Sequence, residues 1–154
     1  MTNHQRIGSI SNSHVGREFE NLALEILTQK GIHLRSNHSI NVGLGDRKKA
    51  HKFDLGSDDP AVIVECKAQT WTSGDKVPSA KMKNWSEAMF YFAIAPQKYR
   101  KIFFIQKSVR HSNGETLGAY YLRTHFHLIP ENVEFWECDP ETKETTILEK
   151  ELSS

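Results

Sequence analysis

Apolar residues recur at steps of three and four in two segments of the chain, which is the period of an amphipathic helix. The first segment covers residues 13–30, with Ser13 as a plausible N-cap and Gly31 as the stop signal. The second covers residues 79–95 and is closed by Pro96, which cannot continue a helix. The pattern therefore predicts two helices.

Other segments alternate apolar and polar residues or are rich in β-branched and aromatic residues, which is typical of strands. The expected strands cover residues 32–40, 53–55, 61–69, 102–107, 118–122 and 133–137. A hairpin turn is expected at residues 56–60, and residues 41–52 are expected to form a loop. Residues 88–95 are apolar all round, which leaves a strand open there as an alternative to the helix.

This succession of helices and strands predicts an α/β fold with a central mixed sheet flanked by helices. A chain of 154 residues with 38% hydrophobic residues fits one globular domain. Residues 1–13 are polar and without periodicity, so we expect a flexible leader there. Residues 14–154 are then a single domain that ends in an acidic segment.

The net charge of +1 hides an asymmetry along the chain. Residues 131–154 carry a net charge of −6, so residues 1–130 carry +7. A basic body is compatible with a face that binds a polyanion, because local potential attracts phosphates, although a merely solvated surface is the alternative. The acidic segment is expected to cover a sheet edge, to mimic nucleic acid or to form a subunit contact. The sequence does not distinguish between these three roles.

Two cysteines, Cys66 and Cys138, are too few for a disulfide framework, so the expected compartment is the cytoplasm. No segment approaches the ~20 apolar residues that span a bilayer, and no membrane association is expected. His125 and His127 would share a strand face, but a third zinc ligand at standard spacing is lacking.

One strand combines charges with an apolar run. In residues 61–69, alternation places Glu65, Lys67 and Gln69 on one face, and the hairpin brings Asp54 alongside. Buried charges need a compensating partner, which is either a divalent cation or a plain salt bridge. An E-x-K tripeptide alone is weak evidence, since a second copy, Glu141-Thr142-Lys143, stands in the acidic segment without a preceding apolar run.

Phe53-Asp54 followed by Glu65-Cys66-Lys67 resembles the motif of the PD-(D/E)xK nuclease superfamily, the fold of many restriction endonucleases and of archaeal Holliday-junction resolvases. Gly16 stands four residues before Glu20, as in the resolvase opening helix, where a glycine precedes a metal-binding glutamate. The resemblance makes Glu20 the matching acid, with Glu18 as the fallback. It covers residues 14–36 and 53–69.

The resemblance implies a restriction-endonuclease-like core and a metal-dependent hydrolysis. Asp54, Glu65 and the backbone carbonyl of Cys66 are the implied direct ligands, and Glu20 completes the site through water. Oxygen ligands of this kind suit Mg²⁺ or Mn²⁺ better than zinc. Lys67 is then expected to orient the attacking water or to stabilise charge on the phosphorus.

The function implied is a Mg²⁺-dependent deoxyribonuclease, an endonuclease of junction, repair or restriction type. Gln69 is a further candidate for contact with the attacking water or a phosphate. A homodimer is implied by resemblance, because cutting both strands needs two sites. The alternatives are a catalytically silent module of the same fold that binds nucleic acid or a protein partner, and a structural ion-pair cluster.

A basic, glycine-flanked segment precedes Asp54. Its cationic residues are Arg47, Lys48, Lys49, His51 and Lys52. Arg47, Lys48, Lys49 and Lys52 are the predicted contacts to the DNA backbone, on a loop that would border the scissile phosphate. The alternative is a solvated loop without a partner.

Overall fold

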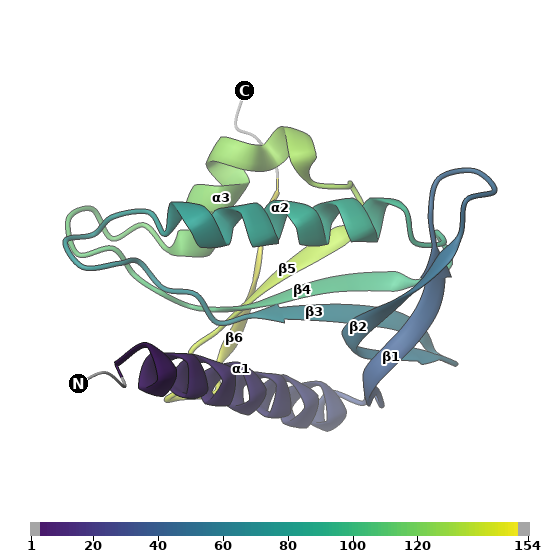
Figure 1. The fold of residues 1–154 in the computed structure, drawn as a ribbon, viewed down its shortest axis with the longest axis horizontal. Coiled ribbons are helices and arrows are strands. Elements are labelled where there is room, and N and C mark those ends of the chain that lie inside the picture. Colours follow the sequence, from purple (N-terminus) through teal and green to yellow (C-terminus); the bar gives the residue numbers. More distant parts are fainter. Residues whose placement is uncertain (1–3, 151–154) are drawn as a thin grey trace.

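The structure, a computed structural model, describes the backbone of residues 4–150 and the side chains of residues 13–150. Figure 1 shows its helices and strands in chain order. They are α1 (His4–Gln29), β1 (Arg35–Val42), β2 (Lys49–Asp58), β3 (Ala61–Lys67), α2 (Ser79–Ala93), β4 (Arg100–Gln106), α3 (Leu117–His125), the 3₁₀ turn η1 (Phe126–Leu128), β5 (Val133–Cys138) and β6 (Thr145–Leu148).

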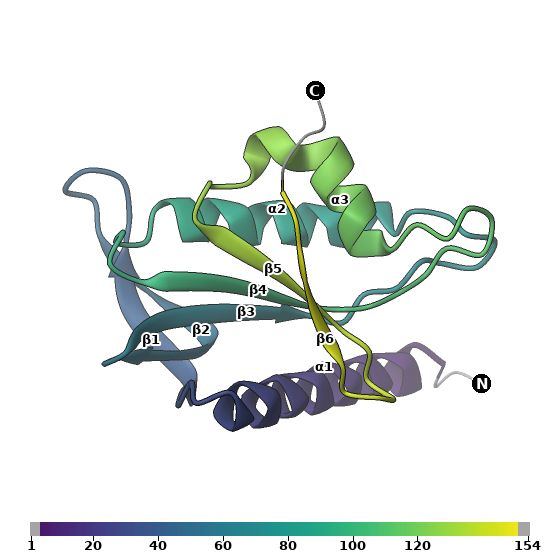
Figure 2. The same cartoon turned by 180° about the vertical axis from the view of Figure 1, so that it is seen from behind.

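The six strands form one mixed sheet in the order β1-β2-β3-β4-β5-β6. Strand β2 is antiparallel to both of its neighbours, β1 and β3. Strands β3, β4 and β5 are parallel, and β6 returns antiparallel to β5. Parallel neighbours need crossover connections, and α2 and α3 supply them on one face of the sheet, while α1 covers the other face (Figures 1 and 2). The predicted α/β class with a mixed sheet between helices is confirmed.

Alternate residues of β3 enter two different hydrophobic cores. Val62, Val64 and Cys66 pack on the α1 side with Phe19 and its neighbours. Ile63 packs on the other side, in the core that α2 and α3 cover. The alternation predicted for this strand is therefore confirmed, and it assigns Glu65 to the face of Ile63.

The predicted helix over residues 79–95 is confirmed as α2, so the strand alternative for residues 88–95 is wrong. The strand predicted over residues 118–122 is also wrong, because this segment lies in α3. Thr116 caps that helix by accepting a hydrogen bond from the Ala119 N–H at 3.1 Å. With this strand lost, His125 and His127 share no strand face.

Helix α1 begins at His4, nine residues before the predicted start, so Ser13 is not its N-cap. Residues 4–13 of the expected leader are helical, and residues 1–3 lie outside the described part. The predicted stop at Gly31 is confirmed. Gly31 has a φ of +85°, and Ile32 donates to the Leu27 carbonyl at 2.9 Å, the pattern of a Schellman C-cap.

The hairpin between residues 54 and 65 is confirmed, but its strands are longer than expected. β2 runs to Asp58, so the turn is reduced to residues 59 and 60. β2 also begins at Lys49, so residues 49–52, predicted as loop, are strand. Between residues 4 and 150, no helix is long and apolar enough to cross a bilayer.

The acidic segment contributes a strand that the sequence did not predict. Residues Thr145–Leu148 pair with β5 as strand β6, so this part of the segment covers an edge of the sheet. Of the three roles considered for it, the described residues fit this one.

We predict that Gly56→Ala destabilises the protein by about 1 to 3 kcal/mol, because an added methyl group would overpack the sheet. A Cβ at Gly56 would lie 2.9 Å from the Cβ of His38 and 3.0 Å from the carbonyl oxygen of Val62. The matched control is Gly16→Ala in α1, where nothing lies within 4 Å and alanine favours the helix. Urea unfolding of both variants tests this prediction. An equal loss of unfolding free energy in the two variants would contradict it.

Candidate active site

The site begins where strand β2 separates from β3. Their ladder runs from the pair Asp58 and Ala61 to the pair Leu55 and Val64 and ends there. At the next position the Asp54 carboxylate replaces a backbone partner, since its Oδ2 accepts a hydrogen bond from the Cys66 backbone N–H at 2.8 Å. An unpaired backbone N–H at this depth would be costly, so this bond fixes the carboxylate beside β3.

Strand β2 is irregular at Asp54. Phe53 packs in the core under α2, whereas Leu55, two residues on, packs in the core against α1. Residues two apart on a regular strand share a face, so the backbone reorients between them. Opposite Asp54, Asn37 of β1 has a φ of +57° and is skipped by the ladder. Irregularities of this kind are frequent beside active sites.

Glu65 is 9% exposed and its carboxyl group lies next to that of Asp54. Burial, the negative charge of Asp54 and a hydrogen bond to the Asp54 side chain raise the pKa of Glu65 to about 9, against the opposing effect of the Lys67 ammonium. The shift favours the neutral form of the Glu65 carboxyl group. Two carboxylates held this closely cannot both ionise cheaply.

Glu20 approaches the same group from α1. Burial raises the pKa of Glu20 first, the Asp54 charge raises it further, and the charges of Lys67 and Arg17 lower it. Asp54 and Lys67 thus influence both Glu20 and Glu65. The other acid considered on this helix, Glu18, is exposed and forms an ion pair with His14 at 2.9 Å.

A cavity of about 460 Å³ opens at the end of β3, between α1 and the first turn of α2. Glu20, Lys67 and Gln69 belong to its wall, but Asp54 and Glu65 do not. The remaining lining residues are Val15, Gly16, Phe19, Cys66, Ala68, Thr70, Thr72, Pro78 and Lys81. The lysine and the helical acid therefore line the accessible space, while the carboxyl groups of Asp54 and Glu65 lie outside its wall.

Gln69 is fixed by the core. Its Oε1 accepts a hydrogen bond from the Trp85 indole Nε1 at 2.8 Å, and Trp85 is fully buried. Because an indole N–H only donates, the oxygen of the amide must face Trp85. The amide nitrogen is then the donor that Gln69 can offer to the cavity.

His51 also lies at the carboxyl pair, a position that the sequence analysis missed when it grouped His51 with the basic segment. Its Nε2 is 3.9 Å from Glu65 Oε1, and its ring stacks on Tyr91 of α2 with centroids 3.7 Å apart. Burial lowers the pKa of His51, against the opposing effects of Glu87 and Asp54. The only sequence signal for His51 was its position two residues before Phe53, which places both side chains on the same face of a regular strand.

The four predicted phosphate-binding residues, Arg47, Lys48, Lys49 and Lys52, are all exposed, and none lines the cavity. The turn between β1 and β2 is bonded to the C-terminal end of α2, since the Gly43 N–H donates to the Ile94 carbonyl at 3.1 Å. The cavity lies at the opposite end of this helix, where Pro78 and Lys81 line it.

Among the residues that the structure describes, no three His, Cys, Asp or Glu side chains lie close enough to hold one ion. Asp54 and Glu65 are two carboxyl groups that lie in contact. Two carboxylates fit Mg²⁺, which binds through one or two of them and keeps several waters. The water-mediated role expected of Glu20 stays a prediction.

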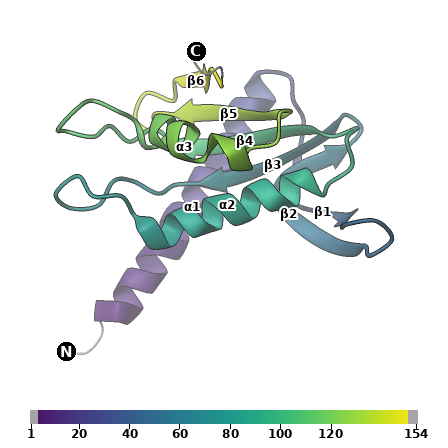
Figure 3. The same cartoon turned by 90° about the horizontal axis from the view of Figure 1, so that it is seen from above.

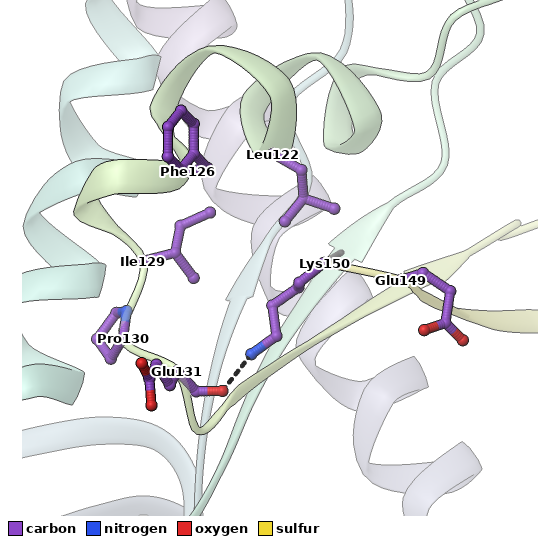
Figure 4. A pocket seen from close by; sticks show the side chains of 7 residues that line it. All are labelled: Leu122, Phe126, Ile129, Pro130, Glu131, Glu149 and Lys150. Atoms are coloured by element: carbon purple, nitrogen blue, oxygen red, sulfur yellow. Dashed lines mark hydrogen bonds between the residues drawn. The ribbon is translucent and has the colours of Figure 1, made fainter. Parts of the chain in front are cut away.

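A second cavity, of about 390 Å³, lies between α3 and the segment after β6 (Figure 4). Leu122, Phe126 and Ile129 give it an apolar wall, and Lys150 donates to the Glu131 carbonyl at 2.6 Å. The groups that line it offer no acid pair comparable to Asp54 and Glu65.

Comparisons of the chain with protein-family models, with curated proteins and with solved structures gave no significant match. The function of the protein therefore has to be inferred from the geometry and electrostatics of the site.

We predict that Glu65→Gln stabilises the metal-free protein by about 3 kcal/mol at pH 8, because glutamine cannot ionise in the buried site. A folded-state pKa of about 9 lies above the unfolded value, so the contribution of Glu65 to stability is complete below pH 4.5 and is lost as the pH rises toward 9. Denaturant unfolding in EDTA between pH 5 and 9 measures both effects.

The matched control for this prediction is Glu18→Gln, which removes an exposed acid from α1. It is expected to leave the free energy of unfolding within about 0.5 kcal/mol of the wild type. A parallel pH dependence for the wild type and Glu65→Gln would show that Glu65 has an ordinary pKa.

Proposed function

We propose that this protein is a metal-dependent endonuclease that hydrolyses DNA phosphodiester bonds, with a core of the restriction-endonuclease type. The observation that carries the proposal is the contact between half-buried Asp54 and buried Glu65, at the position where the β2–β3 ladder ends, with Lys67 beside them. A structural ion-pair cluster would balance these charges within the protein. Here Asp54 and Glu65 lie beside one lysine, Lys67, with Glu20 nearby, and the raised pKa of Glu65 favours its neutral form.

Asp54 and Glu65 are the residues that would hold Mg²⁺ or Mn²⁺, with the Cys66 carbonyl as a further oxygen. When bound, such an ion supplies charge for a phosphate oxygen and lowers the pKa of a water. In the free protein, the proton on Glu65 takes the place of the positive charge that the cation would supply. A bound cation would offset the repulsion between the Asp54 and Glu65 carboxylates, so Glu65 would release its proton when the ion binds.

The remaining roles belong to side chains that face the cavity. The Lys67 ammonium orients the attacking water and stabilises charge that develops on the phosphate. The Gln69 amide, held by Trp85, donates to a phosphate oxygen or to the water. Glu20 accepts hydrogen bonds from waters at the edge of the site.

DNA is the proposed substrate because the chain outside its acidic segment is basic and carries exposed Arg47, Lys48, Lys49 and Lys52. So compact a domain favours a junction or repair nuclease, which reads DNA shape, over a restriction enzyme, which needs an element for reading base edges. One chain offers one acid pair of this kind in its described residues. Cutting both strands would therefore require a homodimer.

We predict that Mn²⁺ or Mg²⁺ supports nicking of plasmid DNA, that EDTA abolishes it, and that Lys67→Ala slows it by about 100-fold or more. The matched control is Lys143→Ala, in the second E-x-K tripeptide, where Lys143 pairs with Glu25 at 3.0 Å on the surface. This variant should nick at the wild-type rate. The readout is the initial rate of open-circle formation on an agarose gel.

Two results would contradict the proposal. Nicking that survives in EDTA or in Lys67→Ala would come from another site or a contaminant. Retarded migration of DNA without cleavage in Mn²⁺ would favour the alternative, a module that binds nucleic acid without cutting it.

A further inference from the structure

The β1–β2 turn presents an apolar side chain to solvent. Leu44 is 65% exposed, more than any other large apolar side chain of the described residues. The turn, residues 43–48, stands clear of the rest of the molecule in two perpendicular views (Figures 1 and 3). A single exposed leucine is ordinary in itself, so its surroundings decide what it means.

The first relevant feature is the tight backbone of this turn. The Arg47 N–H donates to the Leu44 carbonyl at 3.0 Å, and Lys48 Nζ donates to the Gly43 carbonyl at 2.9 Å. Gly43 has a φ of +150°, and a Cβ there would lie 1.9 Å from the Arg47 carbonyl oxygen. With the bond from Gly43 to Ile94 of α2, the turn holds Leu44 outward at little further cost in entropy on binding.

The second feature is charge. Exposed Arg47, Lys48, Lys49 and Lys52 follow Leu44 along the chain, and Asp46 is the one acid of residues 43–52. A positive potential there attracts phosphates near the leucine. An exposed apolar residue beside basic ones is typical of the wedges with which proteins separate base steps in the minor groove.

We propose that Leu44 is a DNA wedge: it inserts between two base pairs while the basic residues of the turn hold the flanking phosphates and the duplex kinks. This inference rests on the proposed nuclease function. Lys49 and Asp54 are five residues apart on β2, which spans at most ~17 Å, or about five base-pair steps. The kink therefore forms on the same duplex as the scissile phosphate and makes bent or branched DNA the preferred substrate.

The test uses 30-base-pair duplexes in which 2-aminopurine is placed at successive positions, with wild-type protein in EDTA so that no cleavage occurs. Unstacking raises the fluorescence, and we expect at least a twofold rise confined to one or two positions. Leu44→Ala should abolish the rise and weaken binding about tenfold, while Leu44→Met should restore both. The matched control is Leu128→Ala, an exposed leucine of η1, which should behave as the wild type.

The outcomes separate this inference from the proposed function. Wild-type cleavage with an unchanged fluorescence rise in Leu44→Ala would overturn the wedge and leave the nuclease standing. Metal-dependent cleavage with no rise at any position would do the same. Binding of wild type, but not Leu44→Ala, to phosphatidylserine vesicles without any rise on DNA would reassign the turn to a membrane surface and overturn the wedge. Failure of wild type to bind or cut DNA at all would overturn both proposals.

Discussion

The hydrogen bond from the Cys66 backbone N–H to the Asp54 carboxylate is the interaction on which the site depends. It forms where β2 leaves β3, so a carboxylate satisfies a backbone group that a strand would otherwise satisfy. The same bond brings Asp54 against Glu65, whose pKa rises to about 9. A bond that satisfies the backbone of the fold thereby also places two acids side by side, where a bound cation would offset their repulsion.

The parts of this site that follow from strand alternation were predictable from the sequence. The apolar run before Glu65 identified β3, and alternation assigned Glu65 to the sheet face opposite Cys66, as the two cores confirm. A glycine stop and a proline stop correctly ended the two long helices. These features are local, so neighbouring residues are sufficient to specify them.

The parts that depend on tertiary contacts were not predictable. Tyr120, Tyr121 and Leu122 have high strand propensity, but the Thr116 cap and the burial of Tyr121 and Leu122 favour a helix. Strand β6 has no apolar alternation of its own and forms because β5 offers an edge. His51 reaches Glu65 through stacking on Tyr91, a residue forty positions away, and sequence spacing carries no trace of that contact.

The proposed function requires that Asp54 and Glu65 share a cation. An anomalous difference map from crystals of the protein soaked in millimolar Mn²⁺ tests this. We predict a peak between these two carboxylates, with oxygen ligands at about 2.0 to 2.6 Å and Glu20 linked to the ion through water. A map without a peak at this position, with the Glu65 and Asp54 carboxyl groups still hydrogen-bonded to each other, would contradict it.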